Sequence, residues 1–539
     1  MKKIKSLFAV LTVIAIILTQ TAFVVSADSS YTLGYSLAGN ETEGYTLTLE
    51  SLTQADGVTE PYDVVVPDTA GYDIDGNGTI EANESGIPVT KIDANAFVGN
   101  KDNKSTLVQS ITIGSKVQTM GDGTSAYVFR YLPKMTELTI PDNVTSLSGR
   151  QIAELSNVTE ITLGKGLETV TYYCIYKCKS LEKINVTSET FKFHLDGFYL
   201  NNPDGAIIDI TACKDITITG LLRNAEGVKF VVSNGNVYNK LIAAGYTDAD
   251  IDYNMADGTE ITVSSVDGKY ALKYTVSGKN VTVNGFDTNP EETVDLVIPS
   301  KVTDPVTGLT FTVNAAAQSA FGSTNIKSVV LPGTIETMGT RLFQNCDSLV
   351  DVELQEGITS LNFYMFYDCR ELSKLIIPAS VTSIDLKSMQ AAHQLKTVVI
   401  LGEDVKFTNK VLSGKEVGGT VFYVKNDTVK AAIDATGSDA TYFNKAEVLG
   451  NETGVPSLSY AENVVTLTVP SYINSYSVLV SQFADENHTK LESVKVYSDT
   501  AVVPGTYNFD VTPVEGKYYK VFIFNSLKGA MPLNSTIEF

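Results

Sequence analysis

A twelve-residue segment near the N-terminus carries acidic and amide side chains at the spacing that calcium-binding loops use. Residues 73–84 read DIDGNGTIEANE and match the EF-hand loop pattern DxDxNGxIxxxE at every diagnostic position. Ca²⁺ takes about six to eight hard oxygen ligands. The predicted ligands, with Thr79 using its backbone carbonyl, are Asp73, Asp75, Asn77, Thr79, Glu81 and Glu84. The sequence therefore predicts a single structural Ca²⁺ site.

The flanks of this segment distinguish it from a calcium sensor. Pro67 and Pro88 stand close on either side, so full flanking helices are not expected. Without a paired helix, calcium binding has no helix to move. Gly78 permits a sharp turn, and Ile80 can contact apolar neighbours. We interpret the segment as a structural calcium clip in a loop of a capping hairpin; a polar surface turn is the alternative.

The residues that usually carry catalysis are scarce. The histidines are His194, His393 and His488, and none has a second histidine at metal-ligand spacing. No GxSxG, P-loop or Rossmann pattern occurs. A glycosidase pair of carboxylates is the catalytic class that the sequence leaves open. We predict that the protein is not an enzyme.

Apolar pairs recur every 23 residues along most of the chain, which predicts a solenoid. In the second half the pairs are Val329 and Leu331, Val352 and Leu354, Leu375 and Ile377, and Val398 and Ile400. In the first half, at spacings of 27, 23 and 23 residues, they are Ile111 and Ile113, Leu138 and Ile140, Ile161 and Leu163, and Ile184 and Val186. One period is one coil, which buries its apolar face only when a neighbour stacks on it. We predict mainly β structure with short helices, in two tandem solenoids of 23-residue coils.

The two arrays begin and end alike, which indicates a tandem duplication of one module. Residues 31–67 and 270–299 each predict a β-hairpin at the start, and residues 230–245 and 422–437 each predict a strand and a short helix at the end. Beyond residue 450 the repeat stops, and strands of period two predict a small antiparallel β-sandwich of immunoglobulin or fibronectin type. The predicted domains are 28–254 with the calcium loop, 255–450 with its own caps, and 451–539.

The cysteines follow the repeat. Five are present, and Cys178, Cys346 and Cys369 share one column of the repeat. Other coils place Leu132, Leu155 and Ala392 in the same column. A column that accepts leucine or alanine favours buried free thiols. A bridge between Cys346 and Cys369 on adjacent coils is the alternative.

The repeat segments resemble a known family. Residues 349–354 (LVDVEL), residues 372–378 (LSKLIIP) and the segment Phe366–Cys369 look like the 23-residue leucine-rich repeats of BspA-like bacterial surface proteins. The resemblance covers most of residues 60–445. It departs at 120–134, where the coil is four residues longer than the repeat, and at 187–218, where the register is lost. The resemblance implies a leucine-rich repeat fold and a secreted or surface-exposed protein that binds host or microbial partners.

The sheet built by the repeat strands is the predicted binding surface. Residues between the inward pairs should point outward, and exposed apolar residues tend to mark contact surfaces. In the first array these residues are Thr112, Thr139, Thr162 and Asn185. In the second they are Val330, Glu353, Ile376 and Val399. Threonine also suits an exposed strand without any partner.

Composition and the N-terminus bear on location and partners. Residues 1–27, with Lys2, Lys3 and Lys5 before an apolar run, predict a secretory signal peptide; an uncleaved anchor is the alternative. The formal net charge of −22 disfavours nucleic acid and anionic membranes as partners. We expect no membrane span in the mature chain, and a location that is extracellular, with retention at the cell surface left open.

These observations predict a non-enzymatic binding or adhesion protein that contacts protein or glycan partners through its repeat sheets. The alternative is a carbohydrate-binding accessory protein of an extracellular polysaccharide-degrading system. The absence of tryptophan weighs against that alternative, although tyrosine can also stack on sugars.

Overall fold

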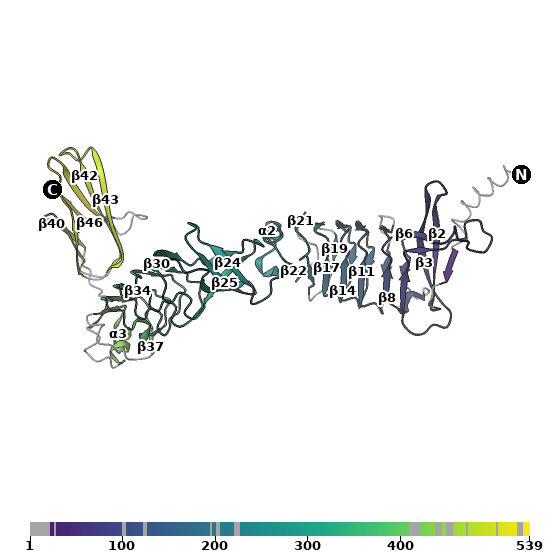
Figure 1. Cartoon of the computed structure of the whole chain (residues 1–539), viewed down its shortest axis with the longest axis horizontal. Helices are drawn as coiled ribbons and strands as arrows, with labels where there is room; N and C mark the ends of the chain where they lie inside the picture. The colour runs from purple at the N-terminus through teal and green to yellow at the C-terminus, as the bar shows by residue number, and fades with distance from the viewer. Residues whose placement is uncertain are drawn as a thin grey trace. The chain divides into compact units, whose positions relative to one another are not determined.

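The computed structural model describes most of the chain, in two compact units (Figure 1). The described residues are 22–25, 29–99, 104–121, 127–194, 197–200, 205–219, 227–408, 420–436, 445–448, 456–469, 473–502, 505–524 and 532–539. One unit consists of Met1–Ala256 with Asp304–Thr310, and the other of Asp257–Thr303 with Phe311–Phe539. The predicted division into residues 28–254, 255–450 and 451–539 stays a prediction. Most of the predicted signal peptide lies outside the described residues.

The first unit begins with a long hairpin. Its sheet has the order β1-β2-β3-β6-β5, where β3 pairs in parallel with β6. The strands are β1 (Ala22–Val25), β2 (Tyr31–Asn40), β3 (Gly44–Gln54), β5 (Thr69–Ala70) and β6 (Ile87–Ile92). A separate pair is formed by β4 (Tyr62–Val66) and β8 (Val108–Ile113). The hairpin of β2 and β3 therefore lies at the same end of the array as its first repeat strands.

The coils of the first unit stack into parallel sheets (Figure 1). One sheet contains β11 (Glu137–Ile140), β14 (Glu160–Leu163), β17 (Lys183–Val186), β20 (Ile207–Asp209), β22 (Lys229–Val232) and β23 (Ile251–Tyr253). A second contains β7 (Phe97–Val98), β10 (Phe129–Arg130), β13 (Ile152–Ala153), β16 (Ile175–Tyr176) and β19 (Phe198–Tyr199). A third contains β12 (Ser146–Ser148), β15 (Thr169–Thr171), β18 (Thr190–Phe193) and β21 (Asp215–Ile218). Each coil thus contributes one strand to each of several faces.

The predicted register is confirmed by the pairing of the strands. Leu138 lies opposite Ile161, which lies opposite Ile184, and all three side chains are buried. The expectation that the register is lost over residues 187–218 is wrong. Ile184 pairs with Ile208, 24 residues later, so the stack continues with an enlarged coil. The one extra residue lies outside the paired strands, so the inward apolar positions stay in place.

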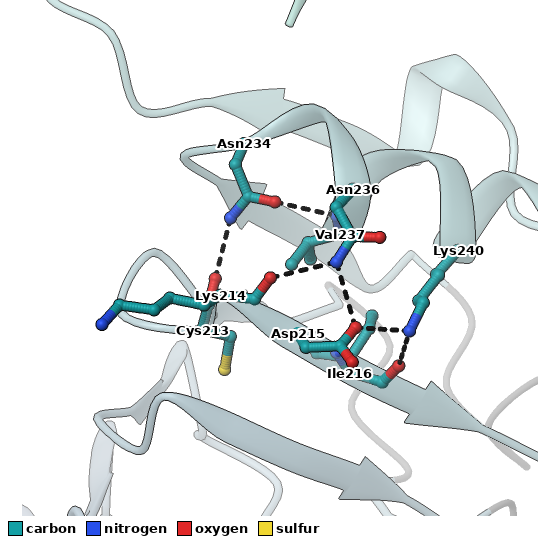
Figure 2. A network of polar contacts seen from close by, with 8 residues as sticks. All are labelled: Cys213, Lys214, Asp215, Ile216, Asn234, Asn236, Val237 and Lys240. Carbon is teal, nitrogen blue, oxygen red and sulfur yellow. Dashed lines mark hydrogen bonds and ion pairs between the residues drawn. The ribbon is translucent and has the colours of Figure 1, made fainter. Parts of the chain in front are cut away.

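Helix α2 (Gly235–Ala243) closes the end of this stack through polar contacts (Figure 2). The Asn234 side chain accepts a hydrogen bond from the Val237 N–H at 3.0 Å and donates one to the Cys213 carbonyl at 2.8 Å. Lys240 donates to the Asp215 carboxylate and, at 3.0 Å, to the Ile216 carbonyl. One asparagine therefore caps the helix and joins it to the neighbouring coil.

The second unit repeats this plan. Its opening sheet has the order β24-β25-β26-β29-β28, with β24 (Glu260–Ser264), β25 (Ala271–Ser277), β26 (Asn280–Phe286), β28 (Lys301–Thr303) and β29 (Thr310–Ala316). One repeat sheet contains β27 (Val294–Val297), β30 (Ile326–Leu331) and β32 (Asp351–Leu354). Another contains β34 (Lys374–Ile377), β36 (Thr397–Ile400), β38 (Val421–Val424) and β39 (Lys445–Val448). A third contains β33 (Ser360–Leu361), β35 (Ser383–Asp385) and β37 (Lys406–Thr408). Stacked rings of Phe321, Phe343 and Phe366, with centroids 5.6 and 5.7 Å apart, fill the interior.

Corresponding details recur at both ends of the two arrays. The Tyr31 hydroxyl accepts the Val65 N–H at 2.9 Å, and the Tyr270 hydroxyl accepts the Val297 N–H at the same distance. Helix α3 (Asp427–Asp434) is capped by Asn426, which also donates to the Glu403 carbonyl at 3.0 Å. These matched contacts are what a duplicated module would retain.

The last part of the chain is antiparallel, as expected. One sheet contains β40 (Ser457–Ala461), β41 (Val464–Val469) and β44 (Gly505–Asp510). The other contains β43 (Leu491–Val502), β42 (Ile473–Phe483), β45 (Tyr518–Phe524) and β46 (Pro532–Glu538). One hydrophobic cluster includes Leu467 from the first sheet and Val478 and Val521 from the second. The assignment to the immunoglobulin or fibronectin type stays a prediction. Within the described residues, no helix is long and apolar enough to span a bilayer.

The cysteines are all free and buried. Cys346 donates to the Phe321 carbonyl at 3.1 Å, and Cys369 to the Phe343 carbonyl at 3.2 Å, each on the preceding coil. The predicted column of buried thiols is confirmed, and the alternative bridge is not formed. Burial raises the pKa of the Cys174 and Cys178 thiols to about 12.

We expect the thiols to resist modification in the folded protein. A thiol reacts as the thiolate, and burial both raises the pKa and blocks access. Treatment with a thiol-specific dye at pH 8 should leave the native chain unlabelled, whereas the chain in guanidinium chloride should react at all five cysteines. Rapid labelling of the native chain at Cys346 or Cys369 would contradict this packing.

Asn234→Ala tests the closure of the first array. Removing the cap and the bond to Cys213 should cost about 1–2 kcal/mol of unfolding free energy and lower the midpoint of that array's thermal transition. Asn236→Ala is the matched control, because Asn236 is exposed and its contacts with Lys214 and Asp215 are solvent-accessible. Equal losses in the two variants would show that the cap carries no special role.

Candidate functional site

The predicted calcium loop lies between β5 and β6, without flanking helices. The carboxylates of Asp73, Asp75 and Glu84 each offer an oxygen within 4.8 Å of the others. Gly76 and Gly78 have φ values of 76° and 90°, so the chain turns sharply at positions where glycine has no steric penalty. The structure therefore brings together three of the six predicted ligands around one point.

Glu84 is the most enclosed of these carboxylates. Its side chain is 2% exposed, and it accepts hydrogen bonds from the Ile74 N–H at 2.8 Å and the Asp75 N–H at 3.2 Å. Asp73 accepts from the Gly76 and Gly78 N–H groups, both at 2.7 Å. These bonds hold both carboxylates toward the inside of the loop. A buried carboxylate needs such partners, because an isolated buried charge is costly.

The other predicted ligands form a second group in the same loop. The Glu81 carboxylate accepts from the Asn77 amide and the Thr79 hydroxyl, both at 2.8 Å. A hydrogen bond shared with Glu84, followed by those from Asn77 and Thr79, lowers the pKa of the Glu81 carboxyl to about 2. Glu81 therefore stays ionised at neutral pH, as a calcium ligand must. Ile80 lies against Gly71, although its side chain remains 47% exposed.

The predicted polar row of the first array is largely present. Thr139 lies opposite Thr162, which lies opposite Asn185, and the three are exposed or half-exposed. The Asn185 amide donates to the Thr162 hydroxyl at 3.2 Å, and Lys183 forms an ion pair with Asp209 at 3.2 Å. Thr112 is exposed but belongs to the two-stranded sheet of β4 and β8. We define Thr139, Thr162 and Asn185 as the threonine row.

The predicted row of the second array is not continuous. Val330 and Glu353 lie opposite each other on β30 and β32, whereas Ile376 and Val399 lie on β34 and β36 of another sheet. Glu353 is exposed, and Val330 and Ile376 are half-buried.

The prediction of Val399 as a surface residue is wrong, because its side chain is fully buried. The larger side chains of Ile376, Leu401 and Tyr423 pack against it. Val399 is therefore part of a small apolar cluster on this face.

The histidines are dispersed and make ordinary contacts. His393 lies 3.7 Å from the Asp368 carboxylate, and His488 packs edge-on against Phe483 with ring centroids 5.0 Å apart. Among the described residues, the group formed by Asp73, Asp75 and Glu84 is the one set of His, Cys, Asp or Glu side chains arranged to hold a metal ion.

Sequence reasoning missed a second surface, formed by large residues at the same turn of six coils. Five residues before the column of Cys178, Cys346 and Cys369, aromatic and cationic side chains alternate along each array. They are Tyr127, Arg150 and Tyr173 in the first array, and Arg341, Tyr364 and Lys387 in the second. We call this set the aromatic–cationic edge. Aligning the coils on the cysteine column would have revealed it.

The comparisons with known proteins agree with the repeat register. The family described as "BspA type Leucine rich repeat region" matches residues 79–204 and 314–422, with 6 copies. The chain belongs to the BspA-type leucine-rich repeat family. The match confirms the predicted solenoid of leucine-rich repeats and supports a repeat-based binding role. Among curated proteins, none matches the chain.

Several solved structures of bacterial leucine-rich repeat proteins are similar to the chain. A Bacteroides capillosus protein is 30% identical over 26% of this chain and 97% of its own, with a TM-score of 0.23. A leucine-rich cell surface protein of Faecalibacterium prausnitzii is 17% identical over 81% and 97%, with a TM-score of 0.22. The pneumococcal vaccine antigen PcpA is 13% identical over 81% and 100%, with a TM-score of 0.24. The family assignment rests on the repeats in residues 79–204 and 314–422.

Proposed function

We propose that this BspA-type protein is an exported, non-enzymatic binding or adhesion protein that contacts a protein or a glycan through its repeat sheets. The observation that carries the proposal is the threonine row. Its side chains stand in register on stacked parallel strands, so each coil presents one polar group in line with the next. The fold holds these groups on rigid strands, which limits the entropy lost when a partner binds.

The polar character of the threonine row suits recognition rather than packing. Glu160, Thr162 and Asn185 are linked by side-chain hydrogen bonds, which fix their orientation before a partner arrives. Lys183 and Asp209 extend the row with a paired charge. A partner can replace water on these groups without requiring the sheet to rearrange.

Substitutions in the threonine row should weaken binding without unfolding the array. In the full chain, Thr139→Lys combined with Thr162→Lys places long cations on the row, and binding found on glycan arrays or panels of extracellular proteins should fall at least tenfold, about 1.4 kcal/mol. Thr145→Lys is the control, because Thr145 is exposed in the same array but precedes β12. Undiminished binding by the double variant would exclude the row as the contact surface.

We propose further that residues 73–84 hold a structural Ca²⁺ ion. The donor set fits a hard cation, because Asp73, Asp75 and Glu84 converge and Glu81 is ionised. Asn77 and Thr79 would complete the ligands through the amide and the backbone carbonyl. Bound calcium would neutralise the clustered carboxylates and fasten the turn that joins β5 to β6.

Calcium should raise the melting temperature of the first unit. A ligand that binds only the folded state stabilises it by about 2.7 kcal/mol at a concentration one hundred times its dissociation constant. Differential scanning calorimetry with millimolar Ca²⁺ or with a chelator should show this shift for the wild type and for Glu60→Ala, which changes an exposed carboxylate outside the loop. Asp73→Ala should abolish the shift; an equal shift in Asp73→Ala, or none in the wild type, would remove the site.

A further inference from the structure

In each array, residues of the aromatic–cationic edge contact further aromatic or cationic side chains close by, such as Arg130 and Tyr176 in the first array and Phe363 in the second. The Arg130 guanidinium lies 4.0 Å from the centre of the Tyr127 ring and 4.3 Å from that of Tyr131. Its Nε pairs with the Glu154 carboxylate at 2.8 Å, and its Nη2 donates to the Tyr131 hydroxyl at 2.8 Å. The cation is therefore held between two rings before any partner binds.

The next coils continue the same arrangement. Arg150 lies over the Tyr176 ring at 4.8 Å, and Lys177 lies 5.0 Å from the centre of the same ring. Tyr199 packs against Tyr176 and Tyr173, with ring centroids 5.1 and 5.5 Å apart. Tyrosines and cations thus form one connected surface over successive coils of the first array.

The second array carries the same combination at the same turn. Arg341 lies 5.8 Å from the centre of the Phe363 ring and 5.7 Å from that of Tyr364. A surface hollow of about 430 Å³ is lined by Arg341, Tyr364 and Tyr367, together with Ser323. The surface therefore occurs in each array and is not a feature of one loop.

Four of the six residues of the aromatic–cationic edge have a left-handed backbone, in which a large side chain is not the least costly choice. The φ values of Arg150, Tyr173, Arg341 and Tyr364 are 59°, 56°, 61° and 59°. This left-handed conformation favours glycine or asparagine, and other residues adopt it at a cost. Large residues kept in such a conformation point to a function for their side chains.

The chemistry of the edge selects its partner. Cations already cover ring faces on Tyr127, Tyr131 and Tyr176, which disfavours stacking of sugars on these rings. The remaining guanidinium N–H groups suit carboxylates, and tyrosine and arginine are enriched in protein interfaces. Arg150 and Lys177 in the first array, and Arg341 and Lys387 in the second, place cations here on a chain whose net charge is −22.

We propose that the aromatic–cationic edge binds a carboxylate-rich segment of a partner protein. This proposal rests on the proposed binding function. It adds one contact surface, the aromatic–cationic edge, and the carboxylate chemistry of the group that the edge binds. Arg150 and Arg341 would engage carboxylates in the two arrays, and the tyrosines would contribute packing and hydroxyl hydrogen bonds. This contact is separate from the threonine row, which lies on β11, β14 and β17.

Fluorescence anisotropy with a labelled octaglutamate peptide tests the edge on the full chain. The wild type should bind octaglutamate and not octaglutamine, and Arg150→Asn combined with Arg341→Asn should weaken binding at least tenfold. Asparagine suits the left-handed backbone, so the melting temperature should not fall. The control that changes the charge equally is Lys165→Asn combined with Lys406→Asn, at exposed lysines, and it should change binding less than twofold.

Any of three binding results would overturn the proposal: no octaglutamate binding, binding unchanged in the double arginine variant, or binding of a heparin octasaccharide in place of octaglutamate. A fall in melting temperature that parallels the loss of binding would assign the arginines to packing and overturn it as well. These failures leave the proposed function standing, because that function is tested on the threonine row with other ligands.

Discussion

The structure depends on the stacking of one coil on the next through parallel strands. A single 23-residue coil has too little interior to bury its apolar residues, and its strands have no partners for their backbone groups. Stacking resolves both problems together, because Leu138, Ile161 and Ile184 become buried as their strands pair. The same strand register that buries these residues also aligns the threonine row and the aromatic–cationic edge from coil to coil. Any surface that the arrays present is therefore repeated at the spacing of the coils.

The ends of such a stack need separate protection, and the chain uses side chains rather than additional coils. Asn234 and Asn426 each cap a helix and donate to a carbonyl of a neighbouring coil. The buried cysteines use preceding carbonyls in a similar way. Side chains thus form hydrogen bonds with backbone groups, at the ends of the arrays and in their interior, that the repeat strands do not pair. Buried polar groups require such partners.

The repeat, its inward positions and the cysteine column could be predicted because each depends on local spacing. The approach of Asp73, Asp75 and Glu84 is also local, because all three lie in one loop between β5 and β6, whereas calcium binding there stays a prediction. Val399 could not be predicted as buried, since its cover comes from Tyr423 on the next strand and from Leu401. The continuation of the stack through residues 187–218 was missed because an enlarged coil changes the spacing without changing the pairing. The aromatic–cationic edge needed an alignment of the coils on the cysteine column and the backbone angles of its turn.

The hydroxyls of Tyr31 and Tyr270 have a consequence for how this chain could lengthen in evolution. Each accepts a backbone N–H from the outermost repeat strand of its array, on Val65 and Val297. An exposed strand edge is a template for pairing with another chain. Because that N–H is already bonded to a tyrosine hydroxyl, an added strand could not use it for one of the backbone hydrogen bonds of the sheet. A module whose edge strand is blocked in this way can be duplicated within one polypeptide. Neither the copies nor neighbouring molecules would then extend their sheets into a continuous fibre.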